Sequence, residues 1–64
     1  MITLGHGGKF ADIRLSRHEL ILINNALNEV CNGVDIEDVE FATRLGADRE
    51  EMRNLLKNIG SLIR

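Results

Sequence analysis

Hydrophobic and polar positions alternate along residues 10–15, in the manner of a strand. A shorter β-type run, Ile2-Thr3-Leu4, precedes this segment. The glycine-rich stretch 5–8 between the two runs predicts a loop, because three glycines lose too much entropy in a regular element. The two runs can pair as a hairpin. Since an isolated two-stranded hairpin is marginal in water, we expect it to pack on the rest of the chain or to pair with another chain.

Beyond residue 15 the apolar spacing becomes helical, and it predicts three helices at about 17–32, 36–45 and 49–59. Each helix starts with a residue pair of the capping-box type, in which two residues three positions apart satisfy each other's backbone N–H groups. The pairs are Ser16 with Glu19, Asp35 with Asp38 (a weaker form), and Asp48 with Glu51.

A glycine marks the expected end of each helix. We expect Gly33 at the C′ position of the first helix, with Val34 making the accompanying hydrophobic contact. Gly46 ends the second helix, and Gly60 ends or weakens the third.

The first helix has one apolar side and one side rich in asparagine. The apolar stripe, which we expect to be buried, comprises Leu20, Ile23, Ala26, Leu27, Val30 and Cys31. The other side carries Asn24, Asn25, Asn28 and Asn32, with Ile21 among them. One interpretation is an ordinary solvated face. The other is a contact surface for a partner helix or a second copy, formed by Ile21, Asn25, Asn28 and Asn32, because uncharged amides around an apolar residue lose their water more cheaply than charges do.

The segment 41–48, Phe-Ala-Thr-Arg-Leu-Gly-Ala-Asp, resembles the centre of a helix-turn-helix. Ala42 matches the small residue at the helix crossing, and Gly46 matches the glycine of the turn. The upstream run 15–20, Leu-Ser-Arg-His-Glu-Leu, is similar to the opening of LuxR-type helix-turn-helix domains. The resemblance covers residues 15–59 and implies a mainly α fold. We therefore expect a strand or hairpin over 1–15, followed by a three-helix helix-turn-helix-like domain over 16–64.

In such a domain the third helix would be the recognition helix. The resemblance then implies that Arg49, Arg53 and Lys57 reach phosphates or guanine and that Asn54 reads adenine. Three acids in the first turn of this helix offset its bases, and the second helix is more acidic still. Since phosphate repulsion opposes the release of counterions that drives DNA affinity, the charge pattern disfavours nucleic acid as a partner.

Length and composition narrow the remaining possibilities. The chain has 64 residues, 44% of them hydrophobic and 28% charged, with a net charge of −2. A single domain this small has little stability to spare, so self-association is a common way for it to gain burial. The sequence shows neither a membrane-length apolar run nor a signal peptide, and its lone Cys31 cannot form an internal disulfide. We therefore expect a cytoplasmic protein without a membrane partner.

The sequence shows no catalytic or metal-binding pattern. His6, His18 and Cys31 lack ligand spacing, and no set of nucleophile, base and orienting residue is visible. The glycine-rich loop lacks the rest of a phosphate motif. We predict a non-catalytic module, without cofactor or metal, that acts in protein–protein interaction, most simply as a homodimer. The alternative is a DNA-binding transcriptional regulator that uses the third helix.

Overall fold

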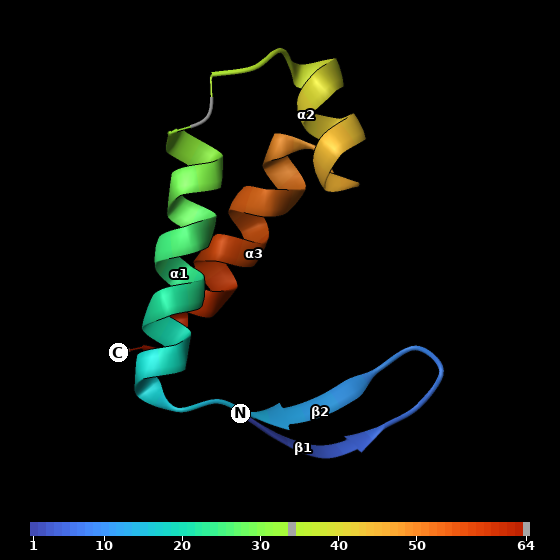
Figure 1. Cartoon of the computed structure of the whole chain (residues 1–64), viewed down its shortest axis with the longest axis vertical. Helices are drawn as coiled ribbons and strands as arrows, with labels where there is room; N and C mark the ends of the chain where they lie inside the picture. The colour runs from blue at the N-terminus through green and yellow to red at the C-terminus, as the bar shows by residue number, and fades with distance from the viewer. Residues whose placement is uncertain (34, 64) are drawn as a thin grey trace.

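A computed structural model describes residues 1–33 and 35–63 of the chain. The element order is β1 (Ile2–His6), β2 (Ala11–Arg14), α1 (Arg17–Asn32), α2 (Asp38–Leu45) and α3 (Arg49–Ser61). The protein is therefore mostly helical, with a two-stranded antiparallel hairpin at its N-terminus. Figure 1 shows α1 and α3 side by side, α2 at the end of the helical part far from the hairpin, and the hairpin projecting from the other end.

The helix starts are confirmed at two of the three expected positions. Ser16 forms the full capping box with Glu19, and the Asp48 carboxylate accepts a hydrogen bond from the Glu51 N–H at 2.8 Å. The start expected at Asp35 is wrong. The N-cap of α2 is Glu37, and the Asp38 carboxylate pairs with Arg49 of α3 instead of forming a box with Asp35.

The helix ends follow the predicted glycines only in part. Gly46 adopts the left-handed conformation, with φ of 72°, and ends α2 as expected. Gly33 caps α1 in a right-handed conformation, so it is not the expected left-handed glycine, and Val34 lies outside the described residues. Gly60 does not end α3, which continues to Ser61. A Cβ at Gly60 would lie 3.4 Å from the Asn24 side-chain oxygen, so α1 and α3 approach each other at this position.

The hairpin is longer on its first strand than the sequence indicates. The expectation of a loop over residues 5–8 is wrong for Gly5 and His6, which pair with Asp12 and Ala11 in the ladder. The register shifts between Thr3 and Gly5, so Leu4 is an extra residue on β1. The second strand is shorter than predicted, since Phe10 and Leu15 fall outside it.

The helices form two contacts, both made by α3. α3 packs along α1 and meets α2 at its own N-terminal end, whereas α1 and α2 do not touch within the described residues. In this part of the chain the only buried hydrophobic residues are Cys31 on α1 and Phe41 on α2. The predicted apolar stripe of α1 is half-buried or buried apart from Ala26, which is exposed, and Asn24 is half-buried on the side that faces α3. The core is thus small and split between the two neighbours of α3.

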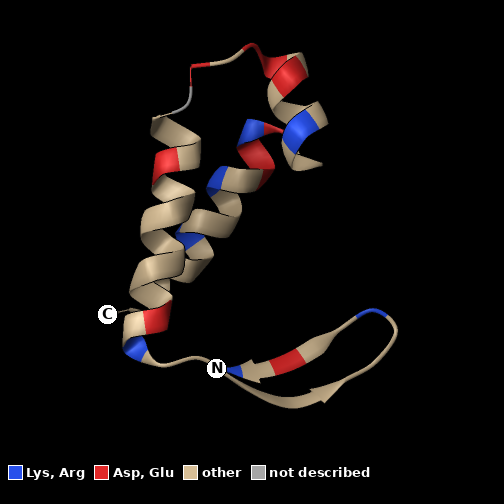
Figure 2. Cartoon of the chain, in the orientation of Figure 1, with Lys and Arg blue, Asp and Glu red and all other residues tan. Residues whose placement is uncertain are grey.

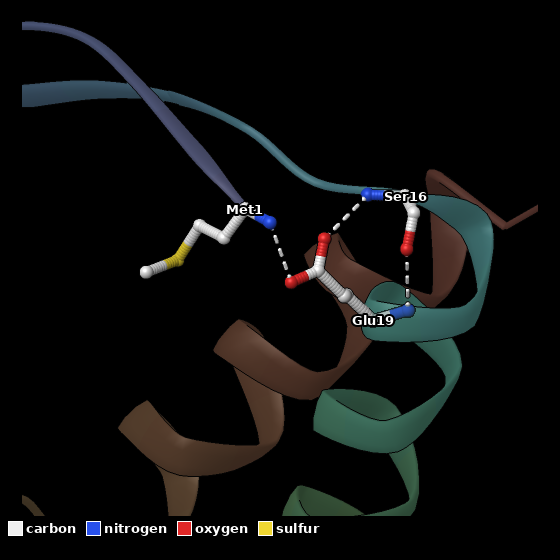
Figure 3. Close-up of polar contacts among 3 residues, drawn as sticks. All are labelled: Met1, Ser16 and Glu19. Atoms are coloured by element: carbon white, nitrogen blue, oxygen red, sulfur yellow. Dashed lines mark hydrogen bonds and ion pairs between the residues drawn. The ribbon is translucent and has the colours of Figure 1, made fainter.

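Among residues 1–33 and 35–63, one ion pair joins the hairpin to the helical part. The Met1 ammonium donates a hydrogen bond to Glu19 Oε2 at 2.8 Å, while Glu19 Oε1 accepts from the Ser16 N–H at 2.9 Å (Figure 3). The Met1 ammonium, followed by the Ser16 N–H, lowers the pKa of Glu19 below its usual value. Both groups stabilise the carboxylate form, so the capping box of α1 also anchors the first residue of the chain.

Candidate interaction surfaces

The asparagine side of α1 is the first candidate surface. We call Ile21, Asn25, Asn28 and Asn32 the amide surface. The three asparagines are exposed and Ile21 is half-buried. Asn32 Nδ2 donates a hydrogen bond to Asn28 Oδ1 at 2.8 Å, one turn away on the same helix. None of the four side chains is charged, so the surface carries neutral polar groups and one apolar side chain.

The hairpin is a second exposed surface. The sequence alone does not decide whether it packs on the helices or pairs with another chain. The two strands pair only with each other among the described elements, and neither strand packs on a helix. Its large apolar side chains stay in solvent: Met1, Ile2, Leu4, Ile13 and, in the connecting turn, Phe10, whose exposed fraction reaches 80%. Of the two outcomes expected for the hairpin, packing on the helices does not occur in this chain.

Arg49 has a role in the fold that its place in the sequence does not reveal. Its Nε donates to Asp38 Oδ1 at 2.9 Å, its Nη2 donates to the Ile36 carbonyl, and its guanidinium lies 4.4 Å from the centre of the Phe41 ring. The side chain is only 21% exposed. Arg49 therefore connects the start of α2 to the start of α3. Its guanidinium is engaged in these contacts within the protein.

The other three residues of the DNA hypothesis are free on α3. Arg53, Asn54 and Lys57 are exposed. Figure 2 shows acidic residues on the segment before α2, on the first turn of α2 and on the first turn of α3, beside these bases. One base of α2, Arg44, pairs with Glu40 at 2.6 Å on its own helix. The N-terminal ends of α2 and α3 therefore present both signs of charge.

No feature of the described residues is typical of a chemical site. They form no pocket, and they hold no group of three His, Cys, Asp or Glu residues that could bind a metal ion. Cys31 is buried in the helical core. None of the helices in residues 1–33 and 35–63 has the length and apolar character required to cross a membrane.

The relation to known proteins adds no further constraint. Comparison with models of known protein families gives no match, and neither the curated proteins nor the solved structures contain a detectably similar chain. The resemblance to LuxR-type helix-turn-helix domains therefore stays a prediction.

Proposed function

We propose that this chain is a non-catalytic interaction module that self-associates, with the amide surface of α1 as a contact surface for a protein partner. The observation that carries the proposal is the distribution of apolar side chains. Two hydrophobic residues are buried in the described chain, whereas ten large ones remain exposed, five of them in residues 1–13. A helical unit with so little core gains stability by burying these side chains against a partner.

The chemistry of the amide surface suits such a contact. Its three asparagines can donate and accept hydrogen bonds, and removing water from them costs less than removing water from the Glu, Lys or Arg residues common on solvated helix faces. The Asn28–Asn32 hydrogen bond already holds two of the side chains in one arrangement, so less side-chain entropy is lost when a partner binds. Ile21 supplies an apolar anchor at the hairpin-proximal end of the surface.

Sedimentation equilibrium and thermal unfolding over a dilution series test self-association. We expect a dimer at high concentration and a melting temperature that rises by roughly 3–5 °C for each tenfold increase in concentration. Ile21→Lys should weaken association, because it replaces the apolar anchor of the surface with a charge. Asn25→Lys tests the same surface at an exposed position, where the substitution does not disturb the helix packing.

Val39→Lys is the matched control, because Val39 is 79% exposed on α2, away from the amide surface. A strictly monomeric wild-type protein, with the same melting temperature at every concentration, would contradict self-association. A dimer weakened equally by Val39→Lys and by the two α1 variants would argue against the amide surface as its contact.

DNA binding is the second candidate function. It is supported by the three-residue turn with a left-handed Gly46 between α2 and α3, which is the connection a helix-turn-helix requires, and by the exposed Arg53, Asn54 and Lys57 on the helix after it. The acids around these bases and the internal contacts of Arg49 favour the first candidate. The helix-turn-helix assignment itself is part of this second proposal.

The second candidate makes its own prediction for an NMR titration with a mixed-sequence duplex at low and at near-physiological salt. If α3 docks on DNA, the chemical-shift changes fall in residues 47–58. Arg53→Ala should then weaken binding and reduce the slope of log affinity against log salt concentration by about 1, the value for one phosphate contact. Lys9→Ala, an exposed base in the hairpin turn, is the control. Binding that is indifferent to Arg53 excludes this docking.

A further inference from the structure

The second strand of the hairpin has a free edge. β2 pairs with β1 on one side, and no other described element pairs with it on the other. An uncovered strand edge carries unpaired N–H and C=O groups and is a template for another strand. β1 is less suited to this role, because its register is broken at Leu4 and irregular edges resist regular pairing.

The side chains of β2 are arranged to match a second copy of the same strand. Asp12 and Arg14 lie on one face of the strand and flank Ile13, which lies on the other. Opposite them on β1 stand Gly5 and Ile2, so neither charge meets an opposite charge within the hairpin. In the described residues Asp12 and Arg14 form no ion pair. Ile13 remains 45% exposed.

An antiparallel pairing of two β2 strands about a two-fold axis at Ile13 gives each of these three side chains a suitable partner. Ile13 then lies opposite Ile13 of the second copy, and each Asp12 lies opposite the other copy's Arg14 on the reverse face. The neighbouring two-fold registers fail, because one centred on Asp12 sets two carboxylates opposite each other and one centred on Arg14 sets two guanidinium groups opposite each other. Directly opposed opposite charges stabilise a sheet, and directly opposed like charges destabilise it.

We infer that two copies of this chain pair through the free edges of their β2 strands, in the register that places Asp12 opposite Arg14, to form a continuous four-stranded sheet. This inference rests on the self-association proposed above and adds a second contact, on β2, to that of the amide surface. It also accounts for the hairpin, because four paired strands can be stable where two isolated strands are marginal. The β2 edge and the amide surface of α1 lie on different elements, so both can contribute contacts to the same assembly.

Pairing in this register requires the hairpin to turn relative to the helices. In Figure 1, β2 is the strand on the side of the helices, and a second hairpin would approach the start of α1. The connection at Leu15 is the natural pivot, because it lies between the end of β2 and the Ser16 cap of α1. In the described part of the chain the Met1–Glu19 ion pair is the one polar link between hairpin and helices. It is exposed, and exposed ion pairs resist such a movement only weakly.

Charge exchange within β2 tests the register by sedimentation equilibrium. We expect Asp12→Arg and Arg14→Asp each to weaken self-association by about tenfold or more, since each turns two attractive pairs into repulsive ones. The double variant D12R/R14D should regain wild-type association, because it restores both pairs with their signs exchanged. An equimolar mixture of the two single variants should form heterodimers more readily than either forms homodimers.

Asp35→Arg and Arg53→Asp are matched controls. They make the same changes of residue and of net charge at exposed positions outside the hairpin. If the wild-type protein dimerises and both single variants dimerise equally well, the β2 pairing is wrong. The same holds if the mixture shows no preference for heterodimers. Either result leaves the proposed self-association intact. A wild-type monomer at every concentration overturns both. Since the heterodimer test compares two variants with each other, loss of monomer stability in one of them cannot mimic a positive result.

Discussion

Phe41→Ala should lower the free energy of unfolding by about 3–5 kcal/mol, the usual range for removing a buried phenylalanine ring. Phe41 is fully buried and is one of two buried hydrophobic residues in the described chain. Domains of this length have stabilities of only a few kcal/mol, at roughly 0.05–0.15 kcal/mol per residue. The substitution should therefore remove most of the stability, and chemical denaturation followed by far-UV circular dichroism measures it.

Val39→Ala provides the comparison on the same helix, because Val39 is exposed. It should change stability by no more than about 0.5 kcal/mol in either direction. A Phe41→Ala variant as stable as Val39→Ala would show that the contact of α2 with α3 contributes little to the fold, and that the helical unit depends on α1 and α3 alone.

Arg49→Met should destabilise the protein by about 2 kcal/mol and release α2 from α3, because it removes a charge-assisted hydrogen bond to a backbone carbonyl and a cation–π contact. Methionine keeps the length of the apolar stem, so the loss reports on the guanidinium. Arg49→Lys should recover only part of the stability. A single ammonium cannot hold Asp38 Oδ1 and the Ile36 carbonyl at once while lying flat over the Phe41 ring.

Arg53→Met is the matched control, since Arg53 is an exposed arginine on the same helix. Equal stability of the Arg49 and Arg53 variants would contradict the role given to Arg49. If Arg49 holds α2 in place, its removal lowers any activity of the helical unit through the fold, and Arg53 and Lys57 are the positions that report on phosphate contacts.

The sequence was sufficient for the features that depend on neighbouring residues. The bounds of α1 agree with its capping box and apolar spacing, because Ser16 and Glu19 satisfy each other's backbone groups whatever the rest of the chain does. The Asp48 cap and the left-handed Gly46 are local in the same sense. The alternation of residues 11–14 likewise identified β2, since period-two patterning follows from backbone geometry.

The tertiary structure decided what depends on distant partners. By its sequence Asp38 is the capping-box partner of Asp35. Instead Arg49, eleven positions later, binds the Asp38 carboxylate, and α2 begins at Asp38 without a side-chain cap. Gly60 reads as a helix stop, yet α3 continues through it where the two helices meet at Asn24. Whether the hairpin covers the helices or leaves its β2 edge free is also a matter of packing over a long sequence separation. Local propensity and spacing fix where an element forms, whereas its neighbours are set by which surfaces meet in space.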